Sequence, residues 1–258
     1  MTHLIALDID GTVLTEAGEL LDEVKFEIGR VVASGNEVML ATGRSVAMTL
    51  PIVDRLGIAP QYVVCSNGAI TLRRGADGYE RAFVETFSPR EVLTTIRSYL
   101  AEANYGVEDE EGVYRYHGTF PAGVLGATSK RVEFDELLDV IATRVVVISP
   151  GTAIDDFLDV VEKMGLHKVS YNVGWTAWLD IAPDGVNKST AMERVRSLLD
   201  IPIDDVIAIG DGRNDIEMLQ WAGRGVAMGQ APDEVKAVAS EVTGSDLDGG
   251  VAQVLAEL

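Results

Sequence analysis

Two pairs of aspartates, one near each end of this 258-residue chain, have the spacing of groups that could act together. Asp8 and Asp10 lie two positions apart, and Asp211 and Asp215 lie four positions apart. If the loops that carry them meet in the folded protein, their carboxylates would repel one another unless a cation neutralised them. Carboxylate oxygens with no histidine in the same loops favour Mg²⁺ over zinc. The sequence therefore predicts a Mg²⁺ site formed by Asp8, Asp10, Asp211 and Asp215.

Hydroxyl, amide and ammonium groups in other short loops could reach the same place. Thr42-Gly43-Arg44 and Ser66-Asn67-Gly68 each follow an apolar run, and Lys188 begins a predicted helix. With Mg²⁺, the Lys188 ammonium and the Thr42 hydroxyl present, an ionised aspartate could attack phosphorus and form an aspartyl-phosphate. A second carboxyl two positions further along the chain could protonate the leaving group and later deprotonate water. This residue set is therefore typical of phosphoryl-transfer chemistry.

Buried strands must place these loops. Apolar runs at residues 3–7, 38–41, 62–65, 206–209 and 226–228 are typical of strands that are covered on both faces. Helical spacing of apolar residues between the runs predicts crossover helices, and hence an α/β fold with a Rossmann-like doubly wound parallel sheet. Because the carboxyl ends of parallel strands line one crevice, we expect the polar loops to converge there.

The pattern changes near residue 80 and returns after Pro183. Tyrosine, valine and tryptophan, which favour strands, are concentrated between these points. We therefore expect residues 1–81 and 184–258 to form a discontinuous catalytic core, and residues 82–183 to form an inserted α/β domain. The acidic run at 108–111 inside the insertion is interpreted as a solvated turn.

Charge and composition exclude several classes of protein. With 41 acidic and 21 basic residues the formal net charge is −20, which argues against a nucleic-acid partner. An anionic substrate would then need a locally positive site. The single cysteine, Cys65, excludes an internal disulfide and a cysteine zinc cluster. No apolar run approaches the roughly 18 residues that span a bilayer, and the first residues lack signal-peptide features, so we expect a cytoplasmic protein without a membrane partner.

The motifs together resemble a known family. The run Asp8-Ile9-Asp10-Gly11-Thr12, the run Thr42-Gly43-Arg44, Lys188 and the run Gly210-Asp211-Gly212-Arg213-Asn214-Asp215 are similar, in that order, to the four motifs of the haloacid dehalogenase-like superfamily. Asn67-Gly68-Ala69 and the segment 223–229 further resemble its Cof-type sugar-phosphatase branch. One departure is Gln230, where that branch usually has asparagine. The resemblance covers the whole core, and it implies that the insertion is an α/β cap.

The resemblance also implies roles for individual residues. Asp8 would be the nucleophile, Asp10 the general acid and base, and Thr42 and Lys188 would bind the phosphoryl group. Mg²⁺ would take carboxylate oxygens from Asp8 and Asp211 and the main-chain oxygen of Asp10, with Asp215 either a direct ligand or an outer group. Residues on the substrate side would be Gly43, Arg44, Asn67 and Asn214. The substrate would be a small phosphorylated metabolite, and Mg²⁺ the cofactor.

The cap itself gives weaker signals. Caps usually supply specificity, but each polar or aromatic residue of the insertion is more simply explained as core or surface. The candidates of this kind are Tyr114, Arg115, His117, Lys168, Trp175 and Trp178.

Three other interpretations compete with a hydrolase. Asp8 could begin a calcium-binding loop whose twelfth position is Glu19, but Val13 stands where such loops need glycine and a strand precedes it, so we reject this hypothesis. A phosphotransferase or mutase of the same superfamily would pass the phosphoryl group to a second hydroxyl instead of water. A non-enzymatic phospho-aspartate signalling switch would use similar groups, but such a domain has no insertion of about a hundred residues.

Overall fold

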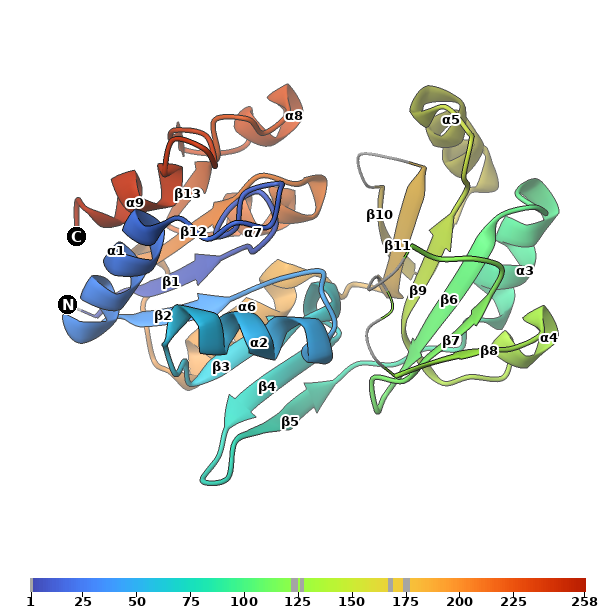
Figure 1. The fold of residues 1–258 in the computed structure, drawn as a ribbon, viewed down its shortest axis with the longest axis horizontal. Coiled ribbons are helices and arrows are strands. Elements are labelled where there is room, and N and C mark those ends of the chain that lie inside the picture. The colour runs from blue at the N-terminus through green and yellow to red at the C-terminus, as the bar shows by residue number, and fades with distance from the viewer. Residues whose placement is uncertain (1, 122–124, 126–127, 167–168, 174–176) are drawn as a thin grey trace.

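A five-stranded parallel sheet forms the centre of one of the two parts of the molecule, on the left in Figure 1. The computed structural model describes residues 2–121, 125, 128–166, 169–173 and 177–258. Adjacent strands of this sheet run parallel throughout. In sheet order the strands are β14 (Glu241–Val242), β13 (Arg224–Ala227), β12 (Val206–Gly210), β1 (Leu4–Leu7) and β2 (Glu37–Leu40). The predicted α/β fold with a parallel core is confirmed.

Helices cover both faces of this sheet because its strands are apolar on both sides. Leu4 and Ala6 of β1 pack into the cluster under helices α6 (Lys188–Leu198) and α7 (Ile216–Trp221). The alternate residues of the same strand, Ile5 and Leu7, pack with helices α1 (Asp22–Ala33) and α9 (Gly250–Leu255) on the other face. Because successive side chains of a strand point to opposite faces, one strand contributes residues to the hydrophobic cores on both sides of the sheet. Two further helices belong to this part of the molecule, α2 (Val46–Leu56) and α8 (Asp233–Lys236).

The predicted third strand, β3 (Tyr62–Cys65), lies beside the central sheet but pairs mainly elsewhere. It meets the end of β2 through one parallel bridge, between Ala41 and Val64. Its full partner is β4 (Ile70–Arg74), which is antiparallel and continues into β5 (Tyr79–Val84) to complete a three-stranded sheet. The short 3₁₀ turn η1 (Ser66–Gly68) reverses the chain directly after β3, and this reversal makes the antiparallel pairing possible.

The insertion forms a second sheet with its own core. The order of its six strands is β10-β11-β9-β6-β7-β8, and every pairing is antiparallel except that of β7 with β8. Helices α3 (Arg90–Tyr99) and α5 (Ile154–Met164) lie against this sheet, next to the short helix α4 (Phe134–Leu137) (Figure 1). The strands are β6 (Asn104–Asp109), β7 (Tyr114–His117), β8 (Ser129–Arg131), β9 (Ala142–Ile148), β10 (Val169–Val173) and β11 (Trp178–Pro183).

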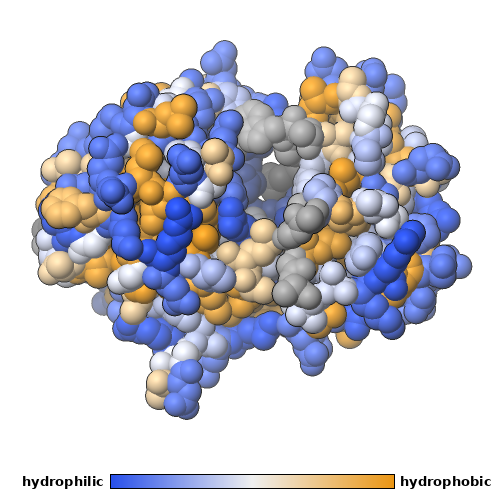
Figure 2. Space-filling model, viewed as in Figure 1, coloured by the Kyte–Doolittle hydropathy of each residue, from blue (hydrophilic) through white to orange (hydrophobic). Residues whose placement is uncertain are grey.

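The surface is hollowed between the two parts of the molecule (Figure 2). The first predicted boundary, between residues 81 and 82, falls inside β5, and the second coincides with the end of β11 at Pro183. The division into core and inserted domain stays a prediction. Within the described residues, no helix combines the length and the apolar character that crossing a membrane requires.

Candidate active site

The side chain of Lys188 joins two loops of the central sheet. Its Nζ lies 2.6 Å from Asp8 Oδ1 and 2.6 Å from Asp215 Oδ1, and all three side chains are buried. Asp8 directly follows β1, and Asp215 ends the short turn η3 (Arg213–Asp215) after β12. Lys188 is the first residue of α6, whose N-cap Asn187 accepts a hydrogen bond from Thr190 N–H and fixes the start of the helix.

Asp211 lies beside this pair. Its Oδ1 accepts a hydrogen bond from the Thr12 hydroxyl over 3.2 Å, and the side chain is almost fully buried. Gly11 makes this packing possible, because a Cβ atom there would lie 2.4 Å from Asp211 Oδ2, and its φ of +74° favours glycine. Asp215 Oδ2 accepts hydrogen bonds from the main-chain N–H groups of Asp211 and Gly212, and these bonds stabilise the conformation of the loop.

The buried carboxylates have the charge and spacing to hold a divalent cation. One carboxylate oxygen from each of Asp8, Asp211 and Asp215 lies within 4.8 Å of the others. Three ionised carboxylates and one ammonium give −3 + 1 = −2, which a divalent ion would balance. Burial is the main cause that raises the pKa of Asp8 to about 7, against the opposing effect of Lys188. Burial and the charge of Asp8 likewise raise the pKa of Asp211 to about 8. These donors fit Mg²⁺, which prefers carboxylate oxygens.

Lys188 stays charged in this surrounding. Burial by itself disfavours the ammonium, but the carboxylates of Asp215 and Asp8 outweigh it and raise the pKa of Lys188 above its ordinary range. The site therefore contains a fixed positive charge next to Asp8, as an anionic substrate of this acidic protein would require.

Asp10 stands apart from the other three carboxylates. Its side chain is 61 % exposed and accepts two hydrogen bonds from Arg44, with Arg44 Nε 2.8 Å from Asp10 Oδ2. Asp10 and Arg44 follow neighbouring strands, β1 and β2, and their pairing joins the first and second motifs. The carboxylate of Asp10 is thus not in the buried acidic cluster.

Thr42 and Gly43 complete the loop after β2. Thr42 is buried, and its hydroxyl oxygen accepts a hydrogen bond from Arg44 N–H over 3.1 Å. The main chain of Thr42 contacts two neighbours, since its N–H donates to Val64 and its carbonyl accepts from Asn67. A Cβ at Gly43 would lie 3.1 Å from Asn67 Oδ1, so the glycine lets the two loops touch.

Asn67 is held in a strained turn at the junction of core and insertion. Ser66 and Asn67 have φ values of +49° and +52°, a region that non-glycine residues seldom occupy. Asn67 Oδ1 accepts a hydrogen bond from Asn214 Nδ2 over 3.0 Å, and Asn67 Nδ2 donates to Asp180 Oδ2 over 3.1 Å. The structure therefore brings Asn67 and Asn214 together beside the acidic cluster.

Sequence reasoning missed three buried charged residues of the insertion. Asp180 on β11 pairs with Arg144 on β9 through two hydrogen bonds. Glu108 on β6 accepts hydrogen bonds from Ser66 and Tyr114, and burial, opposed by Arg144, raises its pKa. Asp180 and Arg144 each stand in an otherwise apolar run, and this signal could have indicated them.

The interpretation of residues 108–111 as a solvated turn is wrong for its first residue. Glu108 belongs to β6 and is fully buried, whereas Glu110 and Glu111 are exposed in the turn that follows. Asp109, the next residue of β6, is only partly buried, and the pairing of β6 with β9 is irregular between these two residues. Of the weaker candidates in the insertion, Lys168 and Trp175 lie outside the described residues.

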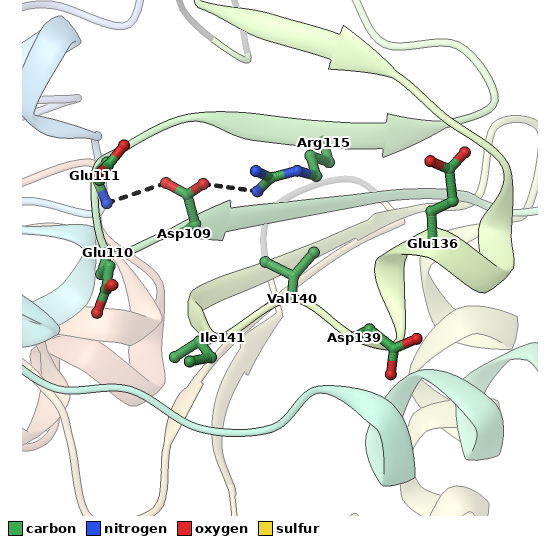
Figure 3. A pocket seen from close by; sticks show the side chains of 8 residues that line it. All are labelled: Asp109, Glu110, Glu111, Arg115, Glu136, Asp139, Val140 and Ile141. Atoms are coloured by element: carbon green, nitrogen blue, oxygen red, sulfur yellow. Dashed lines mark hydrogen bonds and ion pairs between the residues drawn. The ribbon is translucent and has the colours of Figure 1, made fainter.

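A separate pocket in the insertion contains none of the predicted catalytic, metal-binding or phosphate-binding residues, and of the weaker candidates it contains only Arg115. Its volume is about 410 Å³, and five of its side chains are acidic while only Arg115 is basic (Figure 3). Asp109 binds Arg115 there, as the dashed line in Figure 3 marks. The negative lining disfavours a phosphorylated ligand. The lining residues are Asp109, Glu110, Glu111, Arg115, Glu136, Asp139, Val140 and Ile141.

Comparisons with known proteins show relatives along the whole chain. Residues 5–255 match the family described as haloacid dehalogenase-like hydrolase. The chain is 26 % identical to the 5-amino-6-(5-phospho-D-ribitylamino)uracil phosphatase YitU of Bacillus subtilis, over 99 % of this chain and 97 % of that protein. It is 27 % identical to the pyridoxal phosphate phosphatase YbhA of Escherichia coli, over 98 % of this chain and 97 % of that protein. The solved structure of the subclass IIB sugar phosphatase BT4131 shares the fold, with a TM-score of 0.83 at 21 % identity over 99 % of this chain and 98 % of that one.

Proposed function

Because this chain belongs to the haloacid dehalogenase-like hydrolase family, we propose that it is a Mg²⁺-dependent phosphomonoester hydrolase of a small phosphorylated metabolite, such as a sugar phosphate. The observation that carries the proposal is the buried contact of Lys188 with Asp8 and Asp215, with Asp211 beside them. The names of YitU and YbhA, which describe phosphatases of small phosphorylated molecules, support it.

The metal would be held by the carboxylates of Asp8 and Asp211 and the main-chain oxygen of Asp10. Asp215 would act either as a further ligand or as a group that orients them. When bound, Mg²⁺ supplies positive charge that offsets the repulsion between a carboxylate and a phosphate dianion. Lys188 supplies the same kind of charge from the protein itself.

Asp8 would act as the nucleophile. One of its carboxylate oxygens attacks phosphorus, the bond from phosphorus to the leaving oxygen breaks, and an aspartyl-phosphate forms on Asp8. The Thr42 hydroxyl and the Lys188 ammonium would donate hydrogen bonds to the phosphoryl oxygens during this step. Gly43, Arg44, Asn67 and Asn214 would line the substrate side.

Asp10 would handle the protons. In its protonated form it would give its proton to the leaving oxygen in the first step. The carboxylate so formed would take a proton from water in the second step, so that the water oxygen attacks phosphorus and the bond to Asp8 breaks. The exposure of its side chain supports contact with an incoming group, and Arg44 binds it from the neighbouring loop.

Turnover of p-nitrophenyl phosphate and of a panel of phosphorylated metabolites by the purified protein in Mg²⁺ tests the proposal. We expect multiple turnovers, and the use of ¹⁸O-labelled water should place the label in inorganic phosphate. Stoichiometric phosphorylation without turnover would instead indicate a signalling switch. Transfer to a second hydroxyl, without label in inorganic phosphate, would indicate a phosphotransferase or mutase.

A further inference from the structure

A row of buried and partly buried hydrogen bonds runs from the insertion to the loop that carries Asp211 and Asp215. Arg144 Nε donates to Asp180 Oδ1 over 2.7 Å, and Asn67 Nδ2 donates to Asp180 Oδ2 over 3.1 Å. Asn214 Nδ2 then donates to Asn67 Oδ1 over 3.0 Å. The row ends on Asn214, which lies in the same loop as Asp211 and Asp215.

The direction of this row is set at one point. An ionised carboxylate can only accept hydrogen bonds, so the amide of Asn67 must turn its nitrogen toward Asp180. Its oxygen then faces Asn214, which must in turn present its own nitrogen to Asn67. A neutral acceptor and donor at position 180 would leave both amides free to flip, because an amide offers a donor on one side and an acceptor on the other. Asp180 therefore determines the orientation of two amides. It contacts the amide of Asn67 directly, and it acts on the amide of Asn214 through Asn67.

Arg144 holds Asp180 in place and balances its charge. Both side chains are about nine-tenths buried, and the guanidinium binds both carboxylate oxygens of Asp180. The same guanidinium donates to the hydroxyl of Tyr114 over 3.0 Å, so it is fixed from a second side. Such a two-bond pair restricts the carboxylate in direction as well as in distance.

The amides matter because they lie at the meeting point of three loops. Asn67 Oδ1 would be 3.1 Å from a Cβ at Gly43, so the amide packs directly on the loop that carries Thr42. A Cβ at Gly212 would lie 2.4 Å from Asn214 Oδ1, so the absence of a side chain at Gly212 leaves room for this amide. A flipped Asn67 amide would instead turn its oxygen toward the Asp180 carboxylate and its nitrogen toward Asn214 Nδ2, and both hydrogen bonds would be lost.

We propose that Asp180, contributed by the insertion, is a positioning residue that fixes the amides of Asn67 and Asn214 at the active site. The inference rests on the proposed phosphatase function and deepens it. Asp180 acts through Asn67. A substitution of either residue should therefore remove the same contribution to the positioning of the active-site amides.

A double-mutant cycle tests this unit. The variants are Asp180→Asn, Asn67→Ala and the double variant, and the substrate is p-nitrophenyl phosphate in saturating Mg²⁺. We expect D180N to lower kcat at least about tenfold while KM changes little, because misplaced groups cost rate more than binding. In the N67A background the same Asp180 change should have no further effect, since the residue through which it acts is missing.

A matched control and a stability measurement separate positioning from structural damage. Asp109→Asn removes one negative charge from another arginine pair of the insertion, in the pocket of Figure 3, and should leave kcat unchanged. Urea unfolding of each variant identifies the conditions under which all of them are folded. If D180N does not fold, Arg144→Lys replaces it in the same cycle, since it keeps the charge beside Asp180 but loses the two-bond contact.

The outcomes are distinguishable. Losses in D180N and N67A that multiply in the double variant would overturn the inference and indicate that Asp180 contacts substrate on its own. A folded D180N with wild-type kcat would also overturn it. A wild-type protein without phosphatase activity would overturn the proposed function itself, and the inference with it.

Discussion

Lys188 Nζ donates a hydrogen bond to Asp8 Oδ1 over 2.6 Å, although the two residues are 180 positions apart in the chain. Asp8 directly follows β1 and Lys188 is the first residue of α6, so the contact joins the end of a strand to the start of a helix. It brings a buried ammonium to a carboxylate that burial would otherwise leave protonated at neutral pH. Asp215 accepts from the same ammonium, so Lys188 links both motifs that carry the acidic cluster.

Replacement of Asp8 should abolish turnover. Asp8→Asn keeps the shape of the side chain but removes the carboxylate that would attack phosphorus. We expect kcat for p-nitrophenyl phosphate to fall at least about 10³-fold, because the covalent step is lost. Circular dichroism should show a folded variant, and activity within a few-fold of the wild type would rule out the covalent mechanism.

Asp10→Asn should affect the second chemical step most. With an activated aryl phosphate the leaving group needs little protonation, so Asp8 should still become phosphorylated. Hydrolysis of the intermediate should slow about 10²-fold or more, because no base activates water. Rapid quench with acid after a single turnover measures the decay of the phosphoenzyme. Decay at the wild-type rate would contradict a role for Asp10 as the base.

Lys188→Met should destabilise the metal-free protein and inactivate it. The change leaves the carboxylates of Asp8 and Asp215 buried without their cation, which costs about 3 kcal/mol of unfolding free energy. Urea unfolding at pH 8 should show this loss, and Mg²⁺ should reduce it by neutralising the same carboxylates. Arg224→Met, at an ion pair on the surface, is the control and should cost about 1 kcal/mol or less. Equal costs at the two positions would contradict the prediction.

Removal of the metal should inactivate the protein, with a pH dependence set by the carboxylates. In the metal-free state the pKa values of Asp8 and Asp211 are raised to about 7 and about 8, so the folded protein binds more protons than the unfolded chain between roughly pH 4 and 8. The stability contribution of this site is therefore present at low pH and is lost as pH rises through this range.

Thermal unfolding after treatment with EDTA tests whether the stability of the metal-free protein falls as pH rises. Tm in EDTA should fall between pH 5 and 8, and the increase in Tm caused by Mg²⁺ should grow over the same range, because the ion competes with protons for these oxygens. Full activity in EDTA would remove the metal from the mechanism. An effect of Mg²⁺ on Tm that is equal at pH 5 and pH 8 would contradict the assignment of the ligands.

Gln230 should matter through the loop that it holds. Its Nε2 donates to the Gly11 carbonyl over 2.6 Å, and its Oε1 accepts from Asp246 N–H over 3.0 Å. Gln230→Ala removes both hydrogen bonds and should cost about 1–2 kcal/mol of unfolding free energy. Because Gly11 packs on Asp211, we also expect a higher Mg²⁺ requirement in activity assays. Gln230→Asn, the residue usual in the resembling branch, should lose less if its shorter side chain still reaches Gly11.

The strands of the central sheet and the polar loops that follow them could be predicted from local sequence patterns. Uninterrupted apolar runs of four to five residues, such as Leu4–Leu7 and Val206–Gly210, are typical of strands that are buried on both faces. The order of the loops at their ends follows from the parallel topology, which local periodicity already indicates. Asp8, Asp211, Asp215 and Lys188 could therefore be assigned to one edge before any coordinates.

The partners of the polar side chains follow from the three-dimensional fold and not from the local sequence. Asp10 and Asp8 are two residues apart, yet one pairs with Arg44 near the surface and the other is buried with Lys188. Asp180 finds Arg144 and Asn67 across 36 and 113 positions. The buried charges of the insertion could not be assigned to the site from sequence. The alternation of residues along a strand indicates which face of the sheet a side chain occupies, but not which other residues pack against that face. The cost of burying a charge is repaid only by a partner that the fold brings from a distant part of the chain.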